Sequence, residues 1–237
     1  MNNLQKSEYI YKYTHERKIK MKTDELFSFE GGLAERLFLS VKYPWEALDV
    51  LLEYIRREGR GLDLNLYKEI KREVWVARSA CISDSALLSA PIIIDEGARV
   101  GDLSHISCSI IGRGSLVGER SEIRRSIFLD FSLAPACNYI SDSLVGEGAI
   151  FKEGSIASGV RADRKEVTLD LGEERVRTGR VHLGALVGDG AKIGQSAVLS
   201  AGTVVERGAT VKPFTRARGL VSAGEVYRGE RIVYDLL

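Results

Sequence analysis

Aliphatic residues return at every sixth position through most of the chain. A first run keeps this step without a break: Val76, Ile82, Leu88, Ile94, Val100 and Ile106. After one slip at Ser109-Ile110-Ile111, three further runs continue it: Ile111, Val117 and Ile123, then Leu133, Tyr139, Val145 and Phe151, then Val187, Ile193, Leu199, Val205 and Val211. A step of six is neither the period of a helix nor that of a long strand. The pattern therefore predicts short strands joined by regular corners.

Small residues have a fixed place in each six-residue unit, as in Val187-Gly188-Asp189-Gly190-Ala191-Lys192. We expect the aliphatic side chain to point inward and glycine to occupy corners that need a positive φ. Three units would close a coil of about eighteen residues, which can bury its core only by stacking on other coils. The repeats predict a mainly β fold, a hexapeptide solenoid of roughly seven coils between residues 74 and 226.

Residues 26–73 have the signals of a helix instead. Pro44 suits the first helical turn, and Arg56 and Arg57 suit the last turn before Gly59. One apolar stripe is expected, with Leu51 at its margin: Trp45, Leu48, Leu52 and Ile55. Because a solenoid has open ends whose backbone groups need cover, we interpret this region as a small N-terminal helical cap with Trp45 in its core.

An excursion between residues 158 and 184 interrupts the repeats. Its alternating segments 166–171 and 175–178 flank Gly172-Glu173-Glu174, which predicts a protruding hairpin. The excursion is strongly basic: Arg161, Arg164, Lys165, Arg175, Arg177 and Arg180. Two interpretations stay open, an arm that closes over an anionic ligand, and a hairpin that grips a neighbouring subunit through its carboxylates, Glu166, Asp170 and Glu174.

Composition limits the classes of partner. With 44% apolar and 28% charged residues in 237, the chain is typical of one soluble domain with room for a small companion. The net charge of +1 argues against nucleic-acid or membrane-surface binding, and no stretch is apolar enough for a membrane span or a signal peptide. Three widely spaced cysteines, Cys81, Cys108 and Cys137, favour a reduced, cytoplasmic protein. The polar, basic segment 1–25 and the tail 227–237 stand outside the repeats.

Four runs carry a more specific pattern, and they span about residues 40–226: Tyr43-Pro44-Trp45-Glu46-Ala47-Leu48, Val117-Gly118-Glu119-Arg120-Ser121-Glu122-Ile123-Arg124-Arg125-Ser126, Asn138-Tyr139-Ile140-Ser141-Asp142-Ser143-Leu144-Val145-Gly146 and Gly154-Ser155-Ile156-Ala157-Ser158-Gly159. Together they resemble the acetyltransferase half of the bifunctional N-acetylglucosamine-1-phosphate uridyltransferase/glucosamine-1-phosphate acetyltransferases and its stand-alone bacterial relatives. This resemblance implies a left-handed parallel β-helix, a homotrimer with active sites between subunits, and acetyl-CoA as co-substrate. It also implies a role connected with the synthesis of UDP-N-acetylglucosamine.

Site residues follow from the same resemblance. The family's histidine base corresponds to Ala136, which cannot accept a proton, so His182 is the candidate replacement. Arg124 stands where the family has a phosphate-binding lysine, and Tyr139 and Asp142 would complete the acceptor site. Two late residues are candidates for the coenzyme phosphates: Arg216 and Arg218.

Two functions remain open. The first is an acyltransferase acting on an amino-sugar phosphate or sugar nucleotide. The second is a catalytically inactive trimeric scaffold or regulatory ligand-binding protein that partners a separate nucleotidyltransferase. No metal site is predicted, because zinc chemistry on this fold needs three histidine ligands, which His105 and His182 cannot supply. We interpret His105 as a lone residue of the coil wall.

Overall fold

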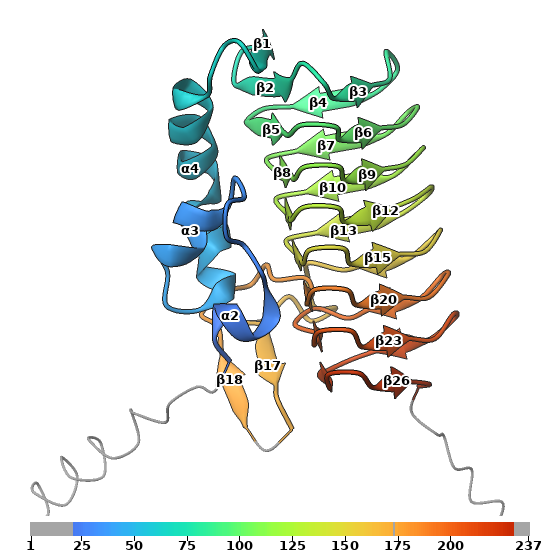
Figure 1. Ribbon diagram of the computed structural model, residues 1–237. Coiled ribbons are helices and arrows are strands. Elements are labelled where there is room, and N and C mark those ends of the chain that lie inside the picture. Colours follow the sequence, from blue (N-terminus) through green and yellow to red (C-terminus); the bar gives the residue numbers. More distant parts are fainter. Residues whose placement is uncertain (1–20, 173, 230–237) are drawn as a thin grey trace, which may run out of the picture.

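The computed structural model describes residues 21–172 and 174–229 as a three-sided parallel solenoid with a helical region along one side (Figure 1). The predicted fold class, a mainly β parallel solenoid with helices and a protruding hairpin, is confirmed. Expectations for residues 1–20 and 230–237, which make up most of the N-terminal segment and of the tail, lie outside the described residues.

Each coil contributes one strand to each of three faces. The first face is a nine-stranded sheet, in which β1 alone is antiparallel: β1 (Tyr67–Lys71), β2 (Val74–Ala77), β5 (Ile92–Ile94), β8 (Ile110–Ile111), β11 (Ile127–Phe128), β14 (Leu144–Val145), β19 (Leu186–Val187), β22 (Val204–Val205) and β25 (Leu220–Val221). The second face has eight strands: β3 (Cys81–Ile82), β6 (Arg99–Val100), β9 (Leu116–Val117), β12 (Leu133–Ala134), β15 (Ile150–Phe151), β20 (Lys192–Ile193), β23 (Thr210–Val211) and β26 (Val226–Tyr227). The third face has seven: β4 (Leu87–Ser89), β7 (His105–Ser107), β10 (Glu122–Arg124), β13 (Tyr139–Ser141), β16 (Ile156–Ala157), β21 (Val198–Leu199) and β24 (Arg216–Ala217).

One aliphatic core runs along the inside of the solenoid, but the repeat is shorter than predicted in the middle coils. Ile110 pairs with Ile127 and Ile127 with Leu144, so these coils have a spacing of 17 residues rather than eighteen. The inward side chains of the third predicted run are consequently Ala134 and Ile140, one position after the predicted Leu133 and Tyr139.

The shortening occurs at the corner between the third and first faces. In three successive coils the corner residue has a left-handed backbone, with φ of 51° at Cys108, 43° at Arg125 and 51° at Asp142. Buried serines follow each of them, and their hydroxyls accept backbone N–H groups from the next coil: Ser126 to Ser109, 3.1 Å, and Ser143 to Ser126, 3.1 Å. A serine column therefore satisfies backbone donors that the tight corner would otherwise bury unpaired.

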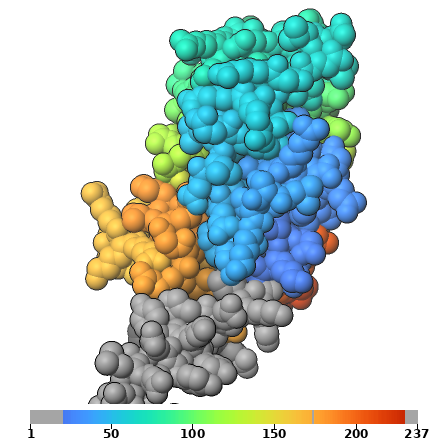
Figure 2. All heavy atoms as spheres, turned by 90° about the vertical axis from the view of Figure 1, so that its left-hand side faces the viewer, coloured from blue at the N-terminus to red at the C-terminus, as the bar shows by residue number. Residues whose placement is uncertain are grey.

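The helical region comprises α2 (Thr23–Leu26), α3 (Glu35–Leu39), the 3₁₀ turn η1 (Pro44–Glu46) and α4 (Ala47–Gly61). It packs along the flank of the solenoid, not across its end as a cap (Figures 1 and 2). The reason is that the outward side chains of the first face are apolar and need cover: Trp75, Ile93, Ile110, Ile127, Leu144, Leu186 and Val204. The first coil is instead extended by β1, which pairs with β2.

Two details of the predicted helix need correction. Leu51 is fully buried, whereas Leu52 lies at the margin of the apolar stripe. The helix also continues through Gly59 to Gly61. Gly59 serves close packing, because a Cβ atom at this position would clash with the Trp75 ring. Trp45 is buried as predicted, with 2% of its surface exposed.

Candidate ligand-binding groove

The predicted hairpin forms between β16 and β19. Its strands, β17 (Thr168–Asp170) and β18 (Arg175–Arg177), are antiparallel, with Asp170 opposite Arg175. Successive side chains along each strand point to opposite sides of the hairpin, so it has an apolar side and a polar side. Val167, Leu169 and Val176 are buried against the helical region, which anchors the hairpin and leaves polar side chains on its other side.

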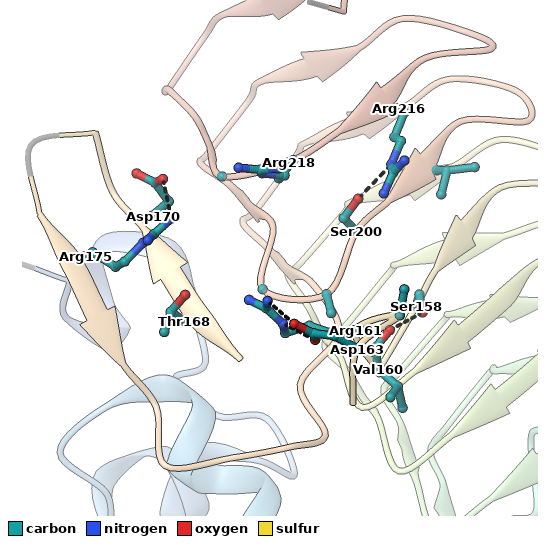
Figure 3. Close-up of a pocket in the computed structure, with 15 residues that line it drawn as sticks. Ser158, Val160, Arg161, Asp163, Thr168, Asp170, Arg175, Ser200, Arg216 and Arg218 are labelled. Atoms are coloured by element: carbon teal, nitrogen blue, oxygen red, sulfur yellow. Dashed lines mark hydrogen bonds and ion pairs between the residues drawn. The ribbon is translucent and has the colours of Figure 1, made fainter. Parts of the chain in front are cut away.

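A groove with a volume of about 850 Å³ lies between this polar side and the last coils of the third face (Figure 3). Three parts of the chain line it: the segment 158–163, the hairpin, and the coils around β21 and β24. Four arginines are among the lining residues: Arg161, Arg175, Arg216 and Arg218.

Two of the four arginines form ion pairs with carboxylates. Arg161 donates to both oxygens of Asp163 at 2.8 and 2.7 Å, and this guanidinium holds the pKa of the Asp163 carboxyl well below its usual range. Arg175 lies 3.7 Å from Asp170.

The other two arginines have no carboxylate partner in the part of the chain that the structure describes. Arg216 donates to the Ser200 hydroxyl at 3.2 Å, and Arg218 points into the groove without an ion pair (Figure 3). Guanidinium groups that no carboxylate neutralises suit phosphate binding, because their planar donors match phosphate oxygens. The two predicted coenzyme residues thus come together at one groove.

The predicted acceptor residues lie on the same face, on strands nearer the N-terminal end of the solenoid than the groove. Arg124 and Tyr139 project outward from the adjoining strands β10 and β13, where Tyr139 is in register with Glu122. Arg124 is half-exposed and forms an ion pair with Glu122, which raises the pKa of Arg124. The structure therefore brings Arg124 and Tyr139 together.

Asp142 is placed differently. Its side chain is buried at the corner after β13, where one oxygen lies 2.8 Å from Arg125 Nη2 and the other accepts the Ser141 hydroxyl. This carboxylate already has structural partners, and a Cβ atom at Gly159 in the next coil would clash with it. A ligand contact by Asp142 stays a prediction.

Ala136 and His182, the two positions considered for the general base, lie in different parts of the structure. Ala136 lies at the corner before β13, where its carbonyl accepts the Gly154 N–H at 3.1 Å. His182 is exposed at the base of the hairpin, and its backbone forms a bridge with Val160, which lines the groove. His182 is thus a neighbour of the groove, although its side chain does not line it.

His105 lies in β7 on the coil wall, as predicted, but its side chain has two neighbours on the adjacent coils. Its Nε2 lies 3.1 Å from the Ser89 hydroxyl, and its Nδ1 lies 3.4 Å from Glu122 Oε1. The parallel register places His105 directly beside Glu122. The signal that was missed is the spacing of 17 residues, which marks neighbours on adjacent coils only once the coil length is known.

Among residues 21–172 and 174–229, no group of three or more histidine, cysteine, aspartate or glutamate side chains is arranged to hold a metal ion. The three cysteines are free: Cys81, Cys108 and Cys137. Within the same residues, no helix is long and apolar enough to cross a membrane.

Comparison with known proteins adds sequence relatives. No protein-family model matches the chain. A bifunctional sugar-1-phosphate nucleotidylyltransferase/acetyltransferase of Sulfurisphaera tokodaii is 24% identical over 199 residues, which cover 82% of this chain and 49% of that protein. The bifunctional protein GlmU of Methanococcus aeolicus is 32% identical over 170 residues, 64% of this chain and 37% of that one. The predicted resemblance is confirmed.

The chain spans about half the length of these bifunctional relatives, or less. Among solved structures, the UDP-N-acetylglucosamine acyltransferase of Campylobacter jejuni aligns with 64% of this chain and 68% of its own, at 11% identity and a TM-score of 0.36. A similarity this low carries no argument about function.

Proposed function

We propose that this protein transfers an acyl group from acyl-CoA, with acetyl-CoA as the first candidate, to an amino-sugar phosphate or sugar nucleotide. The observation that carries the proposal is the groove, where Arg216 and Arg218 face a space of about 850 Å³ without a carboxylate partner in the described chain. Sequence similarity to bifunctional nucleotidylyltransferase/acetyltransferases supports the choice of acyl transfer.

The two predicted sites fit one arrangement. The coenzyme phosphates would bind Arg216 and Arg218, and the acceptor phosphate would bind Arg124 beside Tyr139. On the third face β10, which carries Arg124, is separated from β24, which carries Arg216, by β13, β16 and β21, so the two phosphate sites are about 19 Å apart along the coils. A donor in the groove would therefore extend along the face toward the acceptor.

Acyl transfer to an amine needs a base for the amine proton and a hydrogen-bond donor for the oxyanion. Ala136 cannot supply the base. His182, next to the groove, is our candidate for that role, since its backbone pairs with the groove residue Val160. No carboxylate pairs with His182 among the described residues, so a substrate group would have to orient its ring.

The proposal includes a homotrimer, because the groove is open on the outside of a single chain. It also includes a separate nucleotidyltransferase as a partner, since the similar proteins combine nucleotidylyltransferase and acetyltransferase activities. The alternative of an inactive scaffold or regulatory protein keeps the ligand but loses the transfer step, and the absence of the family histidine at Ala136 favours it.

Calorimetric titration with acetyl-CoA, alone and then with glucosamine-1-phosphate present, tests the proposal. We expect binding in the micromolar range that weakens at least about tenfold in the double variant Arg216→Ala/Arg218→Ala, since each charge-assisted phosphate contact contributes roughly 1.5–3 kcal/mol. Arg177→Ala is the matched control: Arg177 is an exposed hairpin arginine that pairs with Glu166 and does not line the groove.

Binding without acetyl transfer would favour the regulatory alternative. Absence of heat with both compounds, on folded protein, would contradict the groove assignment. Equal weakening in the Arg177→Ala control would show a general effect of charge instead of a specific site.

A further inference from the structure

We propose that Ser89, His105 and Glu122 form a nucleophilic triad that accepts an acyl group from a carboxylic ester onto the Ser89 hydroxyl. The three residues lie on β4, β7 and β10, at the end of the third face away from the groove. This inference does not depend on coenzyme binding or on the groove, although Glu122 pairs with Arg124, the residue proposed to bind the acceptor phosphate.

Parallel register places His105 directly beside Glu122, with Ser89 diagonal to His105 on the other neighbouring strand. Leu88, Ile106 and Ile123 point into the core and are buried, so their neighbours on these strands point outward. His105 pairs with Glu122, and Ser89 pairs with Ser107, two positions after His105. Because each strand is hydrogen-bonded to the next and its inward residue is fixed in the core, the three side chains have a rigid support.

The distances suit a base between a nucleophile and an orienting carboxylate. Ser89 Oγ lies 3.1 Å from His105 Nε2, within hydrogen-bond range. His105 Nδ1 lies 3.4 Å from Glu122 Oε1, an ion-pair distance that is longer than a tight hydrogen bond, as is common in unliganded sites. With the ring proton on Nδ1, beside the carboxylate, Nε2 would be free to take the serine proton.

The surroundings hold the Glu122 carboxylate in place and leave the three side chains partly exposed. Arg124 forms an ion pair with the same Glu122 oxygen and so helps to hold this carboxylate in place. The side chains of His105 and Glu122 are each 30% exposed. Leu87, in register with His105, is 56% exposed and offers an apolar contact for a small acyl chain.

The reaction balances with water as the second substrate. Ser89 Oγ attacks the ester carbonyl carbon while His105 Nε2 takes the hydroxyl proton. The bond from carbon to the leaving oxygen then breaks, and His105 returns the proton to that oxygen, which releases the alcohol. Water next attacks the acyl-serine and gives its proton to His105, which protonates Ser89 Oγ as the carboxylic acid leaves.

The full chain treated with a fluorophosphonate probe, followed by intact-mass and peptide mass spectrometry, tests the triad. We expect one phosphonyl group per chain on Ser89, none in Ser89→Ala, and labelling slowed by about 10²–10⁴-fold in His105→Ala. Ser107→Ala is the matched control, because this serine faces outward on the next strand, and it should label like the wild type.

Release of p-nitrophenol from p-nitrophenyl acetate gives a second readout. Wild type and Ser107→Ala should hydrolyse this ester, and Ser89→Ala should fall to the background rate. The proposal is overturned if folded wild-type protein takes no label, or if Ser89→Ala labels and hydrolyses as fast as wild type. Circular dichroism and thermal unfolding establish that each variant is folded.

Discussion

Trp45 is the residue on which the packing of the helical region can be tested most directly. Its ring stacks on Tyr43 with centroids 4.9 Å apart, and only 2% of the residue is exposed. Trp45→Ala should lower the free energy of unfolding by roughly 3–5 kcal/mol, because it removes a large buried ring and leaves a cavity. Urea unfolding measures the change.

Val50→Ala is the control for this prediction. Val50 lies on α4, close to Trp45 in sequence, but is 42% exposed, so its loss should change the free energy of unfolding by no more than about 0.5 kcal/mol. A change near zero for Trp45→Ala would mean that the helical region is not docked on the solenoid in solution.

Single residues also show what local sequence can and cannot reveal. Pro44 and Trp45 were placed correctly because helix signals and apolar spacing are local. Leu51, rather than Leu52, enters the core because the direction of the stripe depends on the surface that it meets. Tyr139 was placed one position out of phase, since a coil of 17 residues shifts the pattern at a corner that six-residue counting does not detect.

At the scale of elements, one ion pair joins the hairpin to α4. The side chain of Arg180, which follows β18, is 14% exposed and pairs with Asp49, while its Nε donates to the His182 carbonyl at 3.0 Å. Burial lowers the pKa of Arg180, so the charge of Asp49 helps to keep this guanidinium in a largely buried place.

Asp49→Asn should therefore loosen the hairpin. We expect the amides of β17 and β18 to exchange hydrogen faster, with the free energy of local opening lower by about 1 kcal/mol, since the pair is partly open to solvent. Hydrogen-exchange mass spectrometry measures it. Glu53→Gln, which removes an exposed carboxylate from the same helix, should leave the hairpin unchanged. Identical exchange in wild type and Asp49→Asn would contradict the role of the pair.

The hairpin also shows how far sequence patterns extend. Alternation and glycine placed its strands, because both signals are local. Counting six basic residues did not show which of them are neutralised. Only the folded chain shows that Arg177 pairs with Glu166 and that Arg175 lies near Asp170, so these hairpin carboxylates have partners within the chain. That distribution favours the anionic-ligand interpretation of the groove.

At the scale of the whole molecule, the second face offers a surface for assembly. Leu116, Leu133 and Ile150 stack in register on its middle strands and are only partly buried in one chain. An apolar stack of this kind on an otherwise polar surface is typical of a contact between subunits.

We expect sedimentation velocity to give a trimer for the wild type and a smaller species for Leu133→Arg, because an unpaired charge would be buried in the contact. Unchanged assembly of Leu133→Arg would exclude the second face as the interface. A wild-type monomer at micromolar concentration would remove the intersubunit site from the proposed function.

The parallel stacking of the third face has one more consequence. Its strands follow the order β4-β7-β10-β13-β16-β21-β24, and each step advances about 4.8 Å along the axis. The number of coils between His105 and the groove therefore sets the distance between them along the solenoid axis. Gain or loss of a whole coil would move the two ends of the face apart or together in fixed steps, while the chemistry at each end stayed the same.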